Sequence, residues 1–342
     1  SRLGMNTEFI SEVGRDRLGK QIKDFLAENN VKSENVYDYD GGKTALSLAF
    51  LDENMNADYL FYKNDAAQKL DYVMPKIEEN DIIVIGSFFS INDALRENLT
   101  YLLDEAKRKK AIIYYDVNFR KNRKSQVRFL MPNILDNFDY ATIVKGSDED
   151  FDNIFSENDP DLTYKEHIEF YSKNFIYTQG SDGVTVYGKG FKKHYDAKKI
   201  EVVSTVGAGD NFNAGVVYGL LVAGVTFEDL KNGISEDKWD IVVKSAIDFS
   251  SLVCTTLDNY APKDFCEEYS RQNPIPAEEE VKSNDPYIWV PAKQLLIGAA
   301  FYFHGYQGFC REDPFGKPYE KKIRNFPADR LDETWQWHWD EE

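Results

Sequence analysis

Short apolar runs alternate with longer amphipathic stretches through the middle of the chain. Three runs rich in isoleucine, valine and tyrosine occupy 81–86, 111–116 and 140–144, and apolar residues recur at helical spacing between them, at 92–110 and 126–137. Runs of this kind are typical of strands buried on both faces, and strands that alternate with helices form a parallel sheet. The pattern therefore predicts an α/β fold, a doubly wound, mostly parallel sheet flanked by helices.

The N-terminal part has two other patterns. Residues 16–29 carry apolar side chains on one helical face, which predicts an amphipathic helix. From 36 to 63, apolar and small residues alternate with period two on either side of an Asp/Asn/Glu turn, which predicts a small β-hairpin apart from the main sheet. An ordinary surface hairpin is one interpretation, and a lid over a binding site is the other.

The stretch from 203 to 224 joins a glycine turn to a helix. Gly207 and Gly209 flank Ala208, and apolar residues recur at helical spacing after Asp210. The first amides of a helix have no partner within it, the helix dipole is positive at that end, and glycine lets an oxyanion approach the backbone. The stretch therefore predicts an anion site.

Asp210 adds chemistry to this anion site. Positive potential at a helix start favours the ionised carboxylate, which could take the proton of a hydroxyl as that hydroxyl attacks a phosphoryl group. The amides of Gly207, Ala208 and Gly209 would then hold the charge of the transferring group. The alternative is structural, because a glycine turn and an Asp cap also begin many ordinary helices.

The segment 204–215 reads Ser-Thr-Val-Gly-Ala-Gly-Asp-Asn-Phe-Asn-Ala-Gly. It resembles the second signature of the ribokinase-like, or PfkB, carbohydrate kinases, Asp-Thr-x-Gly-Ala-Gly-Asp-x-Phe-x-x-Gly. The resemblance implies a ribokinase-like fold with a small β lid, and Asp210 as general base in front of the anion hole. Ser204 stands where the family usually has the Asp that helps to hold a monovalent cation. Potassium is therefore a doubtful cofactor here.

Two further motifs support the resemblance. Residues 116–120, Asp-Val-Asn-Phe-Arg, resemble the family's Asp-x-Asn-x-Arg, which implies that Asn118 and Arg120 contact sugar or phosphate. Residues 145–151 match the family's Asn-x-x-Glu with Ser147 for Asn and Asp150 for Glu. The resemblance implies that Asp150 and Asp116 organise Mg²⁺, as expected for a hard ion. The alternative for Asp148–Asp150 is a set of acids that favour a helix N-terminus.

The nucleotide-binding turn of the family resembles Thr178-x-Gly-x-x-Gly183. The nucleotide contacts that the resemblance implies are Thr178, Gly180, Ser181, Gly183, Thr205 and Lys145. Residues 183–190 nearly fit a Walker A pattern, but they lack its final Ser/Thr and alternate as a strand would, so we reject that interpretation.

Composition narrows the classes of function. With 41 basic and 59 acidic residues the formal net charge is −18, which disfavours binding to nucleic acid and to anionic membranes. Three widely spaced cysteines predict a reducing compartment and no disulfide framework, so we expect a cytoplasmic protein. The apolar run at 295–303 is too short to span a bilayer.

The resemblance extends over about residues 1–272, with the lid at about 36–63. It places hinge and sugar-edge residues at Gly41-Gly42 and 65–67, and it implies a homodimer that pairs through the lid. The family's first strand and Gly-Gly turn are expected to be missing ahead of residue 1. The segment 273–342 is rich in aromatic residues and resembles nothing; we expect it to pack on the kinase body, a second subunit or a partner.

The resulting prediction is an ATP- and Mg²⁺-dependent kinase that phosphorylates a primary hydroxyl of a small sugar. Overall resemblance favours fructose, followed by ribose and 2-keto-3-deoxygluconate. A nucleoside kinase of the same fold is the rival enzyme. A sugar- or nucleotide-binding protein without catalysis is the rival from another class.

Overall fold

The computed structural model describes residues 1–39, 43–51, 57–62, 70–276 and 295–298. The predicted hinge at 41–42, the sugar edge at 65–67 and nearly all of 273–342 lie outside the described residues. The elements are β1 (Thr7–Phe9), β2 (Ser11–Gly14), α1 (Arg17–Glu28), β3 (Val31–Lys32), β4 (Val36–Tyr39), β5 (Leu46–Leu51), β6 (Ala57–Tyr62), β7 (Ile82–Gly86), α2 (Ser87–Ile91), α3 (Asp93–Arg108), β8 (Ile112–Asp116), η1 (Lys121–Gln126), α4 (Val127–Tyr140), β9 (Ile143–Ser147), α5 (Asp148–Phe155), α6 (Pro160–Thr163), η2 (Tyr164–Ile168), β10 (Phe175–Thr178), η3 (Gly180–Asp182), β11 (Val184–Gly188), β12 (Phe191–Tyr195), α7 (Ala208–Val222), α8 (Phe227–Asn232), α9 (Glu236–Cys254), α10 (Lys263–Gln272) and β13 (Leu295–Gly298).

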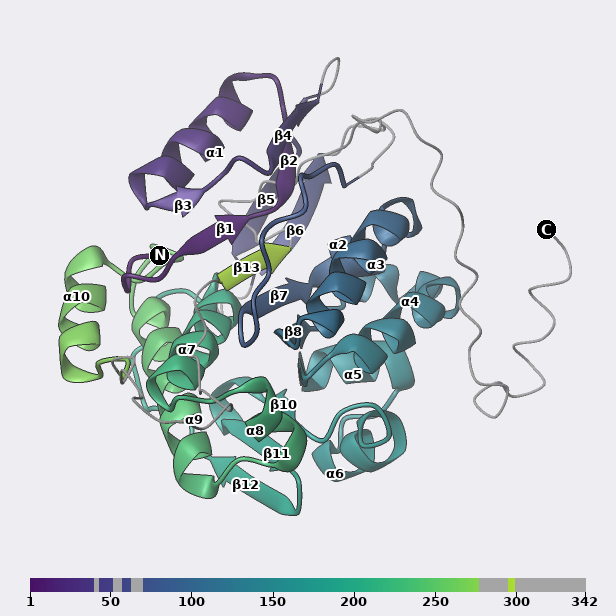
Figure 1. The fold of residues 1–342 in the computed structure, drawn as a ribbon, viewed down its shortest axis with the longest axis vertical. Helices are drawn as coiled ribbons and strands as arrows, with labels where there is room; N and C mark the ends of the chain where they lie inside the picture. The colour runs from purple at the N-terminus through teal and green to yellow at the C-terminus, as the bar shows by residue number, and fades with distance from the viewer. Residues whose placement is uncertain (40–42, 52–56, 63–69, 277–294, 299–342) are drawn as a thin grey trace, which may run out of the picture. The chain divides into compact units, whose positions relative to one another are not determined.

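The main sheet of the described residues has nine strands in the order β12-β11-β10-β9-β8-β7-β13-β1-β3 (Figure 1). Neighbouring strands are parallel except at β10–β11 and β11–β12, which are antiparallel. The predicted α/β fold with a mostly parallel sheet is therefore confirmed.

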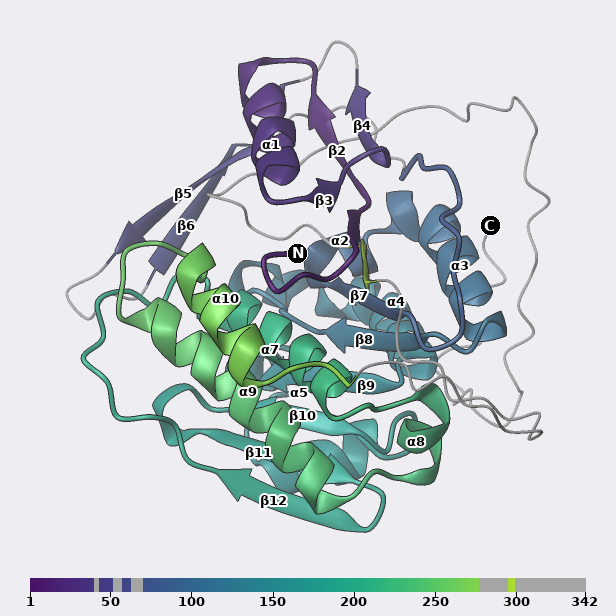
Figure 2. The same cartoon turned by 60° about the vertical axis from the view of Figure 1, so that its left-hand side comes forward.

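Helices cover both faces of this sheet, as Figure 2 shows. On β7, Ile83 and Ile85 join the buried cluster that includes residues of α3, α4 and α5, whereas Ile82 and Val84 join the cluster that includes residues of α7 and α9. Successive side chains of a strand point to opposite faces, so a strand between two helical layers must be apolar throughout. This explains why the sequence shows continuous apolar runs.

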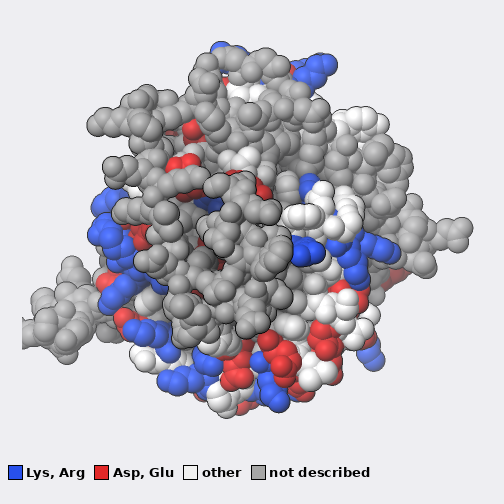
Figure 3. Space-filling view, turned by 90° about the vertical axis from the view of Figure 1, so that its right-hand side faces the viewer, with Lys and Arg blue, Asp and Glu red and all other residues white. Residues whose placement is uncertain are grey.

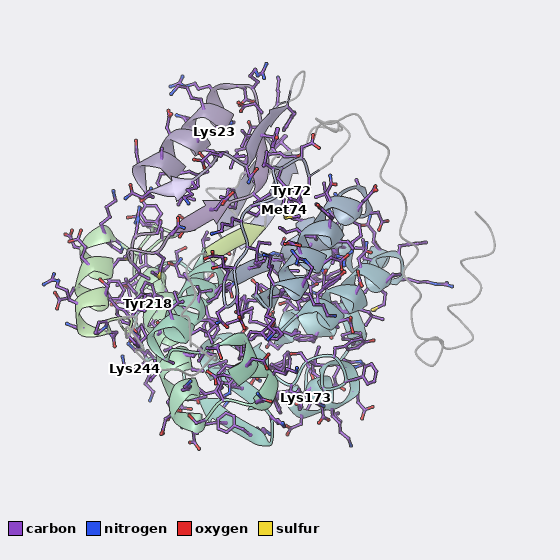
Figure 4. The ribbon with its side chains drawn as sticks, viewed as in Figure 1. Lys23, Tyr72, Met74, Lys173, Tyr218 and Lys244 are labelled. Atoms are coloured by element: carbon purple, nitrogen blue, oxygen red, sulfur yellow. The ribbon has the colours of Figure 1, made fainter. Side chains whose placement is uncertain are left out.

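The segment that precedes β7 packs against the first of these clusters. Tyr72 and Met74, labelled in Figure 4, pack against it. The Tyr72 hydroxyl also donates a hydrogen bond of 2.8 Å to the Asn98 carbonyl in α3. The chain is therefore anchored to this helical layer before it enters the sheet at β7.

Helices α7 and α9 pack with their backbones close together. A Cβ atom at Gly215 would lie 2.5 Å from the Ala246 Cα, and one at Gly219 would lie 2.6 Å from the Val242 Cα. Residues four apart lie on the same helical face, so these two glycines form the contact surface of α7. Gly215 of the signature motif is thus needed for packing, and this packing fixes the helix that carries Asp210.

The N-terminal part of the chain also forms two small sheets apart from the main sheet. Strands β5 and β6 form the antiparallel hairpin, with Leu46 opposite Tyr62 and Leu51 opposite Ala57. Strand β4 pairs in parallel with β2 instead. The hairpin is therefore shorter than predicted, because it spans 46–62 and not 36–63. Asp16 caps α1 and accepts a 2.7 Å hydrogen bond from the Thr44 hydroxyl, which ties the start of the hairpin to that helix.

Strand β13 comes from the C-terminal segment and lies between β7 and β1. It is parallel to both, with Leu295 opposite Ile82 and Thr7, and Ile297 opposite Val84 and Phe9. The sequence pattern assigned this short apolar run to a segment of unknown role. In the structure it completes the main sheet.

Glu12 is a buried carboxyl in β2, and we expect it to make stability depend on pH. Burial raises its pKa from about 4.5 to about 8, against a hydrogen bond from the Asp71 backbone that lowers it. Between these two values the folded state holds a proton that the unfolded state lacks, so stability falls as pH rises. Glu12→Gln should remove this loss and stabilise the protein by roughly 2 to 4 kcal/mol at pH 8.5.

Urea unfolding at pH 5 and pH 8.5 measures the effect of this substitution. Glu28→Gln is the matched control, because Glu28 is exposed at the end of α1. We expect the control to follow the wild type at both pH values. An equal loss of stability with pH in the wild type and in Glu12→Gln would contradict the assignment.

Acidic and basic side chains lie intermixed over the described part of the face shown in Figure 3. The described residues form surface ion pairs such as Lys124–Asp152, at 3.1 Å. Among the described residues no helix has the length and apolar content needed to cross a membrane.

Candidate active site

The predicted motifs meet at the carboxyl edge of the main sheet. Asp116 at the end of β8 lies opposite Lys145 of β9, and Ser147 at the end of β9 lies opposite Thr178 of β10. Carboxyl ends of parallel strands share one edge, which is where ligands bind in sheets of this kind. The structure thus brings three motifs that are far apart in the sequence to neighbouring strand ends.

Asp116 is held by groups from two other elements. Its Oδ1 lies 3.0 Å from the Lys145 Nζ, and its Oδ2 accepts a 2.7 Å hydrogen bond from the Asn213 amide. The Tyr114 hydroxyl donates to the Asn213 Oδ1 at 2.9 Å. Asp116, Lys145 and Asn213 are all buried. The carboxylate therefore has one fixed orientation.

Sequence reasoning did not identify Asn213 as a site residue. It lies within the signature segment, three residues after Asp210 and so on a neighbouring position of the same helical face. This spacing from Asp210 was the signal in the sequence that could have identified Asn213 as a site residue. What Asn213 contacts depends on how α7 packs against β8, and the sequence pattern does not give that contact.

Asp150 connects the start of α5 to the chain that follows β8. Its Oδ2 accepts a 2.8 Å hydrogen bond from the Ser147 N–H, and its Oδ1 accepts a 2.6 Å hydrogen bond from the Phe119 N–H. Ser147 and Asp150 form a capping box. Burial raises the pKa of Asp150, while Lys145 opposes the shift. Asp150 thus also stabilises the start of α5, which was the structural alternative. Its role toward Mg²⁺ stays a prediction.

The loop after β8 turns sharply at Asn118. Its φ is +40°, in the left-handed region that asparagine tolerates better than most residues. The Val117 N–H donates to the Lys145 carbonyl at 2.9 Å, which extends the pairing of β8 and β9 by one residue. Past this turn, the positive charge of Arg120 acts on both Asp150 and Asp210. The loop thus directs a guanidinium toward the carboxylates.

The glycines before and inside the first turn of α7 have different roles. Gly207 has φ +82°, and a Cβ there would lie 2.6 Å from the Asn259 carbonyl oxygen, so only glycine fits. A Cβ at Gly209 would meet no heavy atom nearer than the Lys145 Nζ, at 3.9 Å. The space in front of the first turn is therefore open toward that ammonium group.

The three predicted anion-hole amides, those of Gly207, Ala208 and Gly209, occupy different positions at the start of α7. The Ala208 N–H donates to the Thr205 carbonyl at 3.2 Å, in the turn that leads into α7. The N–H groups of Gly209 and Asp210 belong to the first helical turn, where no i−4 carbonyl is available within the helix. Gly207 precedes this turn as the N-cap.

Asp210 lies in the first turn of α7 and is partly exposed. Burial of the surrounding site raises its pKa to about 6 and the Asp116 carboxylate adds to this rise, while Arg120 and Lys145 oppose it. The helix dipole favours the ionised form, as the sequence predicts, but burial and the Asp116 carboxylate outweigh it. At neutral pH the carboxylate is still mostly ionised, and a pKa near the working pH suits a general base.

The charged side chains of the site have a net negative charge, which a divalent cation would balance. Burial on its own would lower the pKa of Lys145, but Asp116, Asp150 and Asp210 outweigh it and raise that pKa. With Arg120, two cations face these three carboxylates, so negative charge remains. The described residues contain no cluster of three or more acidic, His or Cys side chains close enough to hold a metal by themselves. This donor set fits Mg²⁺ bound through water and nucleotide phosphates.

The predicted nucleotide turn lies at the end of β10. The Thr178 hydroxyl donates a hydrogen bond of 3.5 Å to the Gly146 carbonyl. Ser181 is exposed and lies in the short helical turn η3. Gly180 and Gly183 have φ values of +55° and +96°, and a Cβ at Gly183 would lie 2.2 Å from the Tyr195 carbonyl oxygen. These glycines shape the turn.

Two other sequence interpretations concern neighbouring residues. The near-Walker segment 183–190 contains strand β11, so its rejection is confirmed. Ser204 is buried, and its hydroxyl accepts a 3.2 Å hydrogen bond from the Val206 N–H. The exposed Thr205 precedes α7, next to the anion site.

Comparison with known proteins places this site in a family. The pfkB family carbohydrate kinase profile matches residues 1–256. Probable fructokinase-6, chloroplastic, of Arabidopsis thaliana is 28% identical over 225 residues, which cover 64% of this chain and 58% of the relative. The ATP-dependent 6-phosphofructokinase of Thermoanaerobacterium thermosaccharolyticum is 26% identical over 251 residues, 72% and 76% of the two chains. The chain thus spans less than two thirds of the length of the first relative.

The fold is similar to that of a solved kinase. The crystal structure of fructokinase from Vibrio cholerae O395, in its fructose, ADP and calcium ion bound form, has a TM-score of 0.68 at 18% identity. The similarity covers 78% of this chain and 86% of that one. Since the family profile matches most of the chain, including the Asp210 signature, this chain belongs to the pfkB family of carbohydrate kinases.

Proposed function

We propose that this protein transfers the γ-phosphoryl group of ATP to a primary hydroxyl of a small sugar. The observation that carries the proposal is the position of Asp210, in the first turn of α7, within electrostatic reach of Asp116, Lys145 and Arg120. A base, an anion-binding helix start and two cations are the parts that phosphoryl transfer to an alcohol requires.

In this mechanism Asp210 accepts the proton of the sugar hydroxyl. The hydroxyl oxygen forms a bond to the γ-phosphorus, and the bond from phosphorus to the bridging oxygen breaks, leaving its electron pair on ADP. The amides of the first turn of α7 stabilise charge on the transferring group. Bound Mg²⁺ would neutralise phosphate charge, and Asp116 and Asp150 are the residues that would hold its water ligands.

Fructose is our first choice of acceptor. The similarity to a probable fructokinase supports it. The similarity to a 6-phosphofructokinase makes fructose 6-phosphate a second acceptor to test. Ribose and 2-keto-3-deoxygluconate follow, and a nucleoside acceptor would keep the same chemistry at Asp210.

A coupled ADP-release assay on the full chain, with Mg²⁺ present and potassium varied, tests the proposal. We expect fructose to raise ADP release well above the acceptor-free rate. Stimulation only by fructose 6-phosphate or by a nucleoside would overturn the choice of sugar. Binding of ATP or sugar with no stimulated release by any acceptor would favour a binding protein over an enzyme.

A further inference from the structure

Two polar side chains, those of Tyr114 and Asn213, lie within the apolar layer between β8 and α7. Both are buried, and Tyr114 belongs to the cluster that includes residues of α7 and α9. Asp116 follows Tyr114 by two residues on β8, so its side chain points to the same face of the sheet. Burying a polar group costs free energy unless the group is hydrogen-bonded. Apolar residues would fill this layer at lower cost, so the polar pair calls for a reason beyond packing.

The hydrogen bonds in this layer all run toward Asp116. A carboxylate only accepts, so the Asn213 side chain turns its NH₂ group to the Asp116 Oδ2, at 2.7 Å. The Asn213 Oδ1 then faces Tyr114, whose hydroxyl must donate, at 2.9 Å. Burial, together with the Asp116 charge, raises the pKa of Tyr114 well above its ordinary value, so this hydroxyl keeps its proton. The two donors therefore have one fixed orientation, which ends on a carboxylate at the sheet edge.

Asn213 also ties Asp116 to the helix that carries Asp210. It lies three residues after Asp210 in α7, while the other oxygen of Asp116, Oδ1, is 3.0 Å from the Lys145 Nζ in β9. In the described residues each oxygen of Asp116 thus has one donor, and a carboxylate oxygen can accept two. The remaining capacity of both oxygens is free for a further donor such as a water molecule bound to a metal ion.

We propose that Asn213 is a positioning residue: it holds the Asp116 carboxylate in the orientation that accepts a metal-bound water beside the ATP phosphates, and Tyr114 holds Asn213 in turn. This inference rests on the proposed function and adds to it a residue whose two polar groups are both engaged inside the protein. Asn213 keeps its protons and acts only through Asp116. Without its amide, Asp116 would be held by Lys145 alone and its second oxygen would lose its fixed direction.

Steady-state kinetics with varied Mg²⁺ and calorimetric titration of ATP, with and without Mg²⁺, test Asn213→Leu. Leucine is similar in size to asparagine but has no amide. We expect the Mg²⁺ concentration for half-maximal rate to rise about tenfold, and the gain in ATP affinity that Mg²⁺ provides to shrink accordingly. Metal-free ATP binding should change little. The KM for fructose should stay within a few-fold, because Asn213 is 1% exposed and offers no surface to a sugar.

The double variant Tyr114→Phe with Asn213→Leu separates positioning from stability. Asn213→Leu alone leaves the Tyr114 hydroxyl buried without its partner, which should lower the unfolding temperature. The double variant removes both polar groups from an apolar layer, so stability should largely return. The altered Mg²⁺ response should remain, because Asp116 still lacks its second donor. Tyr114→Phe alone keeps the Asn213 donor and should change the Mg²⁺ response by only a few-fold.

Asn137→Leu is the matched control. Asn137 is also a buried helical asparagine, in α4, but its amide donates to the Ser90 carbonyl at 3.0 Å. We expect a lower unfolding temperature with the wild-type Mg²⁺ response. An Asp116→Asn background gives a second check. There Asn213→Leu should add little, as a double-mutant cycle requires of a residue that acts through Asp116.

The outcomes separate this inference from the proposed function. If Asn213→Leu keeps the wild-type Mg²⁺ response, if the double variant regains that response together with its stability, or if Asn213→Leu adds its full effect to Asp116→Asn, the inference is wrong even when fructose is phosphorylated. If no acceptor stimulates the wild type but the Mg²⁺-dependent gain in ATP affinity still requires Asn213, the proposed function fails and the positioning role stands.

Discussion

Asp210→Ala is expected to lower kcat by about 10²- to 10⁴-fold, the usual contribution of a general base. The substitution removes the carboxylate that takes the hydroxyl proton, but it leaves the amides of α7 and the Lys145 ammonium in place. ATP affinity should therefore stay within a few-fold of the wild type. Coupled ADP release measures kcat, and calorimetric titration measures ATP binding.

The pH profile gives a second check on this base. Burial raises the pKa of Asp210 to about 6. The ionised form is the active one, so kcat of the wild type should fall as pH drops through about 6. The residual rate of Asp210→Ala should not show that fall, because the titrating group is gone.

Asp237→Ala is the matched control for this substitution. Asp237 is also a carboxylate in the first turn of a helix, α9, but it is exposed. Its negative charge interacts favourably with the dipole of α9, as that of Asp210 does with the dipole of α7, but Asp237 does not belong to the site. We expect a small loss of stability and an unchanged kcat. An Asp210→Ala protein with the wild-type rate would mean that another group accepts the proton.

The sequence predicted the main elements because their patterns are local. Continuous apolar runs identified β7 and β8, and helical spacing identified α1, α3 and α4. The start of β9 was placed too early. Tyr140 still belongs to α4, where its hydroxyl donates to Asp104 at 2.8 Å. A short apolar run cannot distinguish the last turn of a buried helix from the first residues of a strand.

Features set by distant contacts could not be read from such patterns. Strand β13 pairs with β1 across nearly the whole chain, and its few apolar residues carry no signal of their partner. Asn213 is similar, because its role depends on reaching Asp116 on another element. The pKa of Asp210 is a balance of burial, two cations and one carboxylate, and only coordinates give their separations.

Gly209→Ala is expected to lower kcat by about 10²- to 10³-fold while the protein stays folded. The new methyl group would meet nothing nearer than the Lys145 Nζ, at 3.9 Å, and the backbone needs no positive φ there. Alanine is also the better helix former, so the unfolding temperature should not fall. The methyl group would occupy the space in front of the first turn of α7, where the transferring phosphoryl group is expected.

Gly190→Ala provides the opposite control. Gly190 lies in the exposed turn between β11 and β12, where an added Cβ has open space but φ is +74°. We expect this variant to lose stability through backbone strain and to keep its kcat. Steady-state kinetics and thermal unfolding on both variants should therefore give opposite results. If Gly209→Ala retained the wild-type kcat, the phosphoryl group could not be bound against this helix start, and the position of Asp210 would need another explanation.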